Sequence, residues 1–164
     1  MAIKFIFILV LLSGAISVTA FAGGGSPYDH GENHRHDSEG SAVGKPAAEP
    51  EATKTIVVTT LDSMRYTFSP QPDLKANEIV KFVITNLGKN PHEFSIGDEE
   101  EQKAHRNMMR QMPDMVHQDG NTVTVKPGET KVLTWEFNGE VEAIFACNVP
   151  GHFEAGMFKT VDIK

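Results

Sequence analysis

Cysteine is nearly absent from this sequence, which has only Cys147 among its 164 residues. A lone cysteine excludes an intramolecular disulfide, and an unpaired thiol is a liability in an oxidising compartment unless something occupies it. Long apolar runs are also missing, because FIFILVLL at residues 5–12 is well short of the ~18 residues of a membrane span. Basic residues are outnumbered, with 15 Lys and Arg against 22 Asp and Glu, which argues against nucleic acid or an anionic membrane surface as the partner.

The first 22 residues have the pattern of a signal peptide. Lys4 precedes the apolar run, and Ala20-Phe21-Ala22 offers a small-residue cleavage point. A lipid anchor there would need a cysteine at the cleavage point, so we expect an exported chain with no membrane anchor that begins near Gly23. Loss of Lys4 changes its formal charge from −7 to −8, which suits a basic protein surface or a cation as the partner.

The exported chain divides into two regions of different composition. Residues 23–53 are rich in Gly, Ser, Pro, Glu and Ala without aliphatic periodicity, which predicts a disordered tail that contains histidines. From Lys54 onward, short runs of β-branched and aromatic residues recur between turn signals, so we place one folded domain at 54–164.

The pattern of residues 54–164 is that of an all-β sandwich. Leu133, Trp135 and Phe137 alternate with polar residues and so share one face of a strand. One helix is predicted at 98–112, where acidic residues open it and a proline ends it. Eight strands in two packed sheets are expected, at residues 54–61, 64–69, 78–86, 92–97, 121–126, 129–137, 141–147 and 158–163.

In the stretch ACNVPGHFEAGM, residues 146–157, Cys147 ends a predicted strand, and the turns that follow bring His152 and Met157 back to the same edge. Thiolate, imidazole and thioether ligands suit copper and disfavour magnesium or calcium, and zinc seldom takes methionine. His92, in the motif PHEF, begins another predicted strand and is the best candidate to complete the set from across the top of the sandwich. Four protein ligands leave no position for a substrate, so the pattern favours electron transfer or metal retention over bond-making catalysis.

PHEF together with CNVPGHFEAGM resembles the cupredoxin family of small periplasmic copper proteins, over residues 54–164. The resemblance implies a Greek-key β-sandwich of about eight strands with one short helical flap, a periplasmic location, a redox or copper-transfer protein partner, and a monomer. One position departs from the family pattern, since many cupredoxins have asparagine where this chain has Glu93, and this position bears on hydrogen bonding around the metal. The type 1 copper ligands implied by the resemblance are His92, Cys147, His152 and Met157.

Two further groups of residues are candidates for additional, weaker copper binding. The tail contains HGENHRH, whose imidazoles either collect Cu(II) on a flexible acidic segment or are incidental to a solvated polar linker. Methionines crowd the predicted helix and the residues after it, where they either bind Cu(I) or pack the helix against the sandwich. A histidine-rich leader with extra methionines resembles the copper-tolerance cupredoxins of the CopI type. The candidates are His30, His34 and His36 in the tail, and His105, Met108, Met109, Met112, Met115 and His117 in and beside the helix.

Three functions follow from these patterns. The first is periplasmic copper tolerance, which the tail and the methionines favour. The second is general electron transfer between respiratory or oxidase partners, for which the tail would be unnecessary. The third, a copper enzyme such as a nitrite reductase or multicopper oxidase, is disfavoured because the single domain has no HCH motif and no repeated His-x-His motif.

Overall fold

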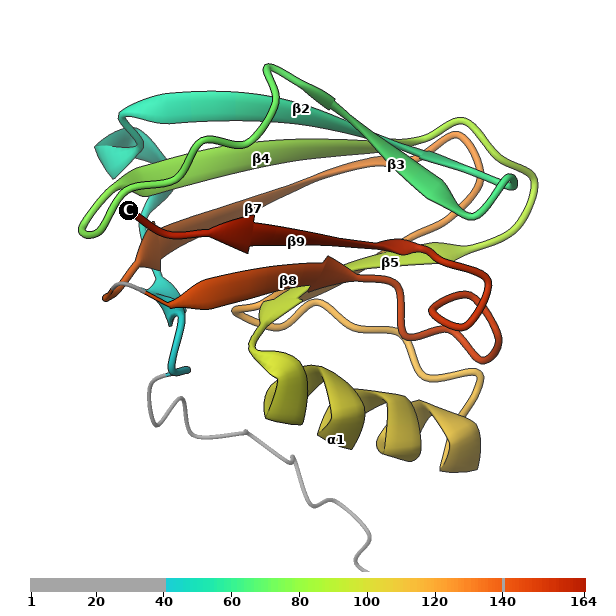
Figure 1. The fold of residues 1–164 in the computed structure, drawn as a ribbon. Helices are drawn as coiled ribbons and strands as arrows, with labels where there is room; N and C mark the ends of the chain where they lie inside the picture. Colours follow the sequence, from blue (N-terminus) through green and yellow to red (C-terminus); the bar gives the residue numbers. More distant parts are fainter. Residues whose placement is uncertain (1–40, 140) are drawn as a thin grey trace, which may run out of the picture. The chain divides into compact units, whose positions relative to one another are not determined.

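The computed structural model describes residues 41–139 and 141–164, which form two β-sheets packed face to face and one α-helix (Figure 1). The predicted all-β sandwich with a short helix is therefore confirmed. One sheet contains, in spatial order, β1 (Gly44–Pro46), β7 (Thr130–Phe137), β4 (Ile79–Asn86), β2 (Lys54–Leu61) and β3 (Arg65–Ser69). The other contains β6 (Thr122–Val125), β5 (His92–Gly97), β8 (Glu142–Ala146) and β9 (Phe158–Asp162). Neighbouring strands are antiparallel except for β2 and β4, which are parallel.

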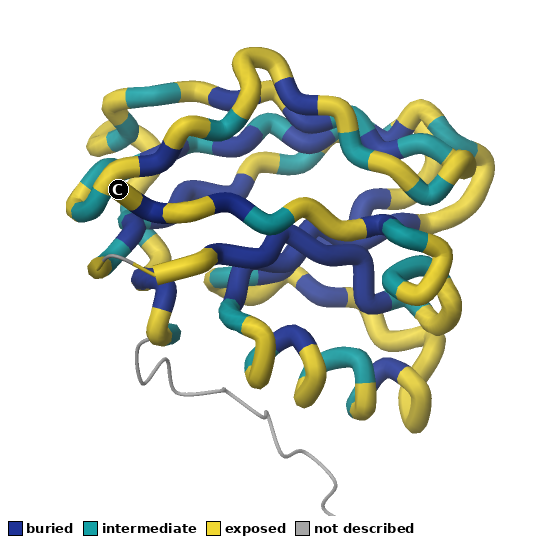
Figure 2. Tube along the Cα trace, viewed as in Figure 1, coloured by how far each residue is buried: buried dark blue, intermediate teal, exposed yellow. Residues whose placement is uncertain are grey.

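The core lies between the two sheets and is centred on aromatic rings. Along β4, every second residue is buried, as expected for a strand with one face against the core. Phe82 of this strand packs against Phe94, Phe137 and Phe145, with ring centroids 5.2, 6.2 and 5.3 Å away. Figure 2 shows buried residues, in dark blue, recurring along the strands of both sheets. These ring contacts pack β4 and β7 of one sheet against β5 and β8 of the other.

All six residues of strand β5 are buried, so neither face of this strand is open to solvent. Phe94 and Ile96 lie in the core between the sheets, while Glu93 and Ser95 alternate onto the opposite face. That outer face is covered by the helix α1 (Glu99–Gln111) and the segment that follows it. A carboxylate therefore lies in the interior of the molecule, under the helix.

Helix α1 begins and ends where the sequence predicts. Asp98 caps it by accepting a hydrogen bond from the Glu101 N–H at 2.8 Å, and Glu101 reciprocates by accepting from the Asp98 N–H at 2.7 Å. Gln102 is buried and donates to the Ile144 carbonyl at 2.9 Å, which ties the helix to β8. The helix is thus fixed to the sheet that contains β5.

The predicted boundary of the folded domain at residue 54 is wrong. Strand β1 and the 3-10 helix η1 (Glu49–Glu51) lie within the stretch assigned to the tail. Val43 is fully buried, and its carbonyl accepts a hydrogen bond from Trp135 Nε1 at 3.4 Å. A three-residue edge strand has no periodicity to detect, since its pairing with β7 is a tertiary contact.

Several predictions about the N-terminal region lie outside the described residues. They are the signal peptide at 1–22 and the tail histidines His30, His34 and His36. Within residues 41–139 and 141–164, no helix combines the length and the apolar character needed to cross a membrane.

Candidate metal centre

Three of the four predicted ligands meet at one end of the sandwich. His92 begins β5, Cys147 directly follows β8, and His152 lies in the loop between β8 and β9. The Cys147 Sγ is 3.3 Å from His152 Nδ1, which is 3.2 Å from His92 Nδ1. All three candidate ligand atoms lie within 4.8 Å of one another. His92 and Cys147 are fully buried, whereas His152 is half-buried.

The loop from Cys147 to Met157 closes on itself through backbone hydrogen bonds. The Met157 N–H donates to the His152 carbonyl at 3.0 Å, and the Cys147 N–H donates to the Met157 carbonyl at 3.0 Å. Gly156 has a φ of +96°, and an added Cβ would lie 2.7 Å from the Arg65 guanidinium, so the last turn favours glycine. Met157 is fully buried, and its backbone carbonyl is joined by this hydrogen bond to the residue that carries the thiol.

The protonation of these groups fits a metal site. Burial raises the pKa of the Cys147 thiol to about 12, while a hydrogen bond from the Glu93 N–H, 3.2 Å from Sγ, acts in the opposite direction. The sulfur therefore stays protonated at neutral pH unless a cation displaces the proton. Burial lowers the pKa of both His92 and His152, which keeps the imidazoles neutral and able to ligate.

Asp62 orients His92 and was not identified from the sequence. Its carboxylate accepts hydrogen bonds from the backbone N–H groups of Lys89 and Asn90, at 2.8 and 3.2 Å. The pKa of Asp62 is lowered to about 2. The hydrogen bond from Lys89 has the largest effect, and those from Asn90 and His92 add to it. An ionised carboxylate 3.2 Å from His92 Nε2 places the imidazole proton on that nitrogen and leaves the Nδ1 lone pair facing Cys147 and His152. Asp62 lies in the turn between β2 and β3, where no sequence pattern indicates that a carboxylate will contact His92.

Replacing Asp62 with Asn is expected to weaken Cu(II) binding at this centre by about 10- to 100-fold, because the amide no longer fixes the His92 tautomer. Competition with a copper chelator of known affinity measures the change. Asp73→Asn is the matched control, since Asp73 is an exposed carboxylate whose partner is Lys164 at the C-terminus. Equal affinity of the Asp62→Asn protein and the control would show that Asp62 has no part in the site.

The methionines predicted in and beside the helix differ in their exposure. Met109 is buried, Met108 is half-buried, and Met112 and Met115 are exposed. The buried sulfur supports the packing interpretation for Met109, while the exposed ones leave the copper interpretation as a prediction. His105 and His117 do come together, with ring centroids 4.7 Å apart, and they meet Glu93, which was not predicted as a ligand.

Comparison with known proteins places this geometry in context. No protein-family model matches the sequence. A copper-resistant cuproprotein CopI of Vibrio cholerae is 46% identical over 140 residues, which cover 85% of this chain and 82% of the relative. The CopI protein of Rubrivivax gelatinosus is 37% identical over 161 residues, covering 95% and 94%.

Solved structures agree at the level of the fold. Auracyanin B superposes with a TM-score of 0.58 at 18% identity, over 76% of this chain and 96% of that one. Reduced auracyanin of Roseiflexus castenholzii gives 0.56 at 17% identity, over 69% and 98%. The sandwich and its cluster of two histidines and one cysteine define a cupredoxin. At the identities found, the chain belongs to the family of copper-resistant cuproproteins CopI.

Proposed function

We propose that this protein is a periplasmic copper-binding protein that acts in copper tolerance. The observation that carries the proposal is the cluster of His92, Cys147 and the half-buried His152 in a chain of the CopI family. Two neutral imidazoles and a thiol, with a thioether in the same loop, are the donor set of a type 1 copper site. His92, Cys147 and His152 would hold the metal, and Met157 would be the weak fourth ligand.

Copper in such a site supplies one-electron chemistry between Cu(I) and Cu(II). The chain contributes rigidity, because Cys147 is tied to Met157 and receives the Glu93 N–H while His92 is tied to Asp62. Fixed ligands reduce the rearrangement that accompanies a change of oxidation state. The half-buried His152 is the group of the cluster that reaches the surface, so electrons would enter and leave there.

The surface next to His152 supports copper handling. A cavity of about 350 Å³ has His152, Met109, Met115 and Val149 among its lining residues. Thioethers favour Cu(I), so this cavity offers soft ligands beside the proposed centre. The second candidate function, electron transfer to a partner protein, is favoured by the exposed Phe158 at the start of β9, which stacks on Phe153 of the preceding loop with ring centroids 4.6 Å apart.

Titration of the metal-free chain lacking residues 1–22 with Cu(II) tests the copper centre. We expect an intense thiolate-to-copper absorption band that saturates at one copper per chain. Absence of the band would overturn the proposed site. Growth of a copper-sensitive bacterium that lacks its own protein of this family then separates tolerance from electron transfer. Rescue of growth on copper by the intact chain but not by Cys147→Ser supports tolerance, and lack of rescue by either contradicts it.

A further inference from the structure

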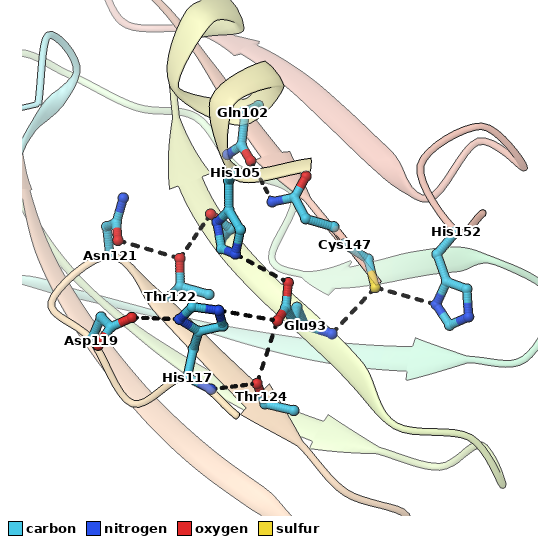
Figure 3. A network of polar contacts seen from close by, with 12 residues as sticks. Glu93, Gln102, His105, His117, Asp119, Asn121, Thr122, Thr124, Cys147 and His152 are labelled. Atoms are coloured by element: carbon cyan, nitrogen blue, oxygen red, sulfur yellow. Dashed lines mark hydrogen bonds and ion pairs between the residues drawn. The ribbon is translucent and has the colours of Figure 1, made fainter. Parts of the chain in front are cut away.

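A second group of metal-ligating side chains lies on the outer face of β5, under the helix. It consists of Glu93 on β5, His105 on α1 and His117 in the segment between α1 and β6 (Figure 3). One ligand atom from each lies within 4.8 Å of the others. The Glu93 side chain is fully buried, and those of His105 and His117 are 13% and 7% exposed. Three separate elements thus bring a carboxylate and two imidazoles into one enclosed place.

The distances in this group differ from those of an ordinary hydrogen-bonded pair. Glu93 Oε2 is 3.6 Å from His105 Nε2, and Glu93 Oε1 is 3.9 Å from His117 Nε2. Both are longer than an N–H···O hydrogen bond, which spans about 2.7–3.2 Å. Two ligand atoms each about 2.1 Å from a tetrahedral ion are about 3.4 Å apart, which is close to the spacing observed.

The orientation of His117 also points to a cation. Its Nδ1 lies 2.6 Å from Asp119 Oδ2, and its backbone N–H donates to Thr124 Oγ1 at 2.8 Å. A proton held on Nδ1 by Asp119 leaves the Nε2 lone pair directed at Glu93, as in metal sites where a carboxylate orients a histidine ligand. Within the described residues, neither His117 Nε2 nor Glu93 Oε2 forms a hydrogen bond, although both are buried. His117 Nε2 faces Glu93 Oε1, and Glu93 Oε2 faces His105 Nε2, so a cation enclosed by the three side chains would satisfy both of these buried acceptors.

We propose that Glu93, His105 and His117 form a second metal site, for a divalent cation of the Cu(II) or Zn(II) class. Two imidazoles and one carboxylate are a ligand set that these ions accept, and the group contains no sulfur that would favour Cu(I). The proposed ligand set includes none of the tail histidines and none of the methionines. It adjoins the first centre through Glu93, whose backbone N–H donates to Cys147 Sγ while its side chain belongs to the second site.

The test counts Cu(II) bound per chain in the protein lacking residues 1–22, with His30, His34 and His36 replaced by Ala to remove the tail ligands. We expect two bound Cu(II) ions, of which only one contributes thiolate absorption, and an electron paramagnetic resonance signal from the other with nitrogen hyperfine structure. Glu93→Gln and His105→Gln, each made in this background, are expected to lower the affinity of the second site for Cu(II) by about 10- to 100-fold or more.

The matched control is Glu100→Gln, which removes the same charge from the exposed surface of α1, where the Glu100 side chain is 81% exposed. It should leave both ions bound. Retention of the thiolate band in Glu93→Gln or His105→Gln shows that the variant is folded. One bound ion in the background protein, or a second ion that binds equally well to both variants, would overturn the second site. The background protein could also bind Cu(II) without thiolate absorption, and the two variants could bind one ion fewer. That result would support the second site and contradict the first.

Discussion

Cys147→Ser is expected to abolish the thiolate-to-copper absorption band and to weaken Cu(II) binding at the first centre by more than about 100-fold, since changes outside the ligand shell already cost 10- to 100-fold. The band requires a sulfur-to-metal bond, and no other cysteine exists in the chain. A serine hydroxyl does not ionise at neutral pH and is a poorer ligand for copper. Visible absorption and chelator competition at matched copper concentrations measure the two effects.

A serine at this position should leave the fold in place. Cys147 is buried just beyond β8, and serine is of similar shape, so circular dichroism of the metal-free variant should match that of the unmodified chain. The Asp73→Asn protein serves again as a comparison with an intact centre. A Cys147→Ser protein that keeps the intense band would disprove the assignment of the thiolate ligand.

Phe145→Ala is expected to lower the free energy of unfolding of the metal-free protein by about 3–5 kcal/mol. Phe145 is fully buried, and its ring centroid lies 5.2 Å from that of Phe94 and 5.3 Å from that of Phe82. Removal of the ring leaves a cavity between the sheets whose rigid aromatic lining cannot collapse fully. Urea unfolding followed by fluorescence of the buried Trp135 measures the loss.

Leu87→Ala is the control for this change, because Leu87 is 68% exposed just after β4 and should alter stability by no more than about 0.5 kcal/mol. Similar losses in the two variants would contradict the placement of Phe145 at the centre of the core. Phe145 also lies two residues before Cys147 on the same chain segment. A weakened core is therefore expected to loosen the centre as well.

Much of the fold could be predicted because strand patterns are local. The alternation of Leu133, Trp135 and Phe137 is written in consecutive residues, and the helix is bounded by Asp98 and Pro113 at its two ends. The edge strand β1 was missed because GKP has no alternating pattern, and its conformation depends on pairing with β7. Short edge strands are decided by the partner strand and by the burial of a neighbour such as Val43.

The residues of the candidate metal sites also differ in how far local sequence predicts them. Cys147, His152 and Met157 lie within eleven consecutive residues, so their spacing alone predicts a common loop, and their chemistry alone predicts copper. Asp62 lies thirty positions from His92, and no local pattern connects them.

The order of residues along the chain was thus sufficient to predict the sandwich and the class of metal and to propose the copper loop, because periodicity and ligand chemistry depend on near neighbours. The tertiary structure alone decided that Glu93 turns away from the first centre and meets His105 and His117. The physical reason is the alternation of side chains on β5: His92 and Glu93 must point to opposite faces, and only the packing of α1 and the segment after it determines what the second face encloses.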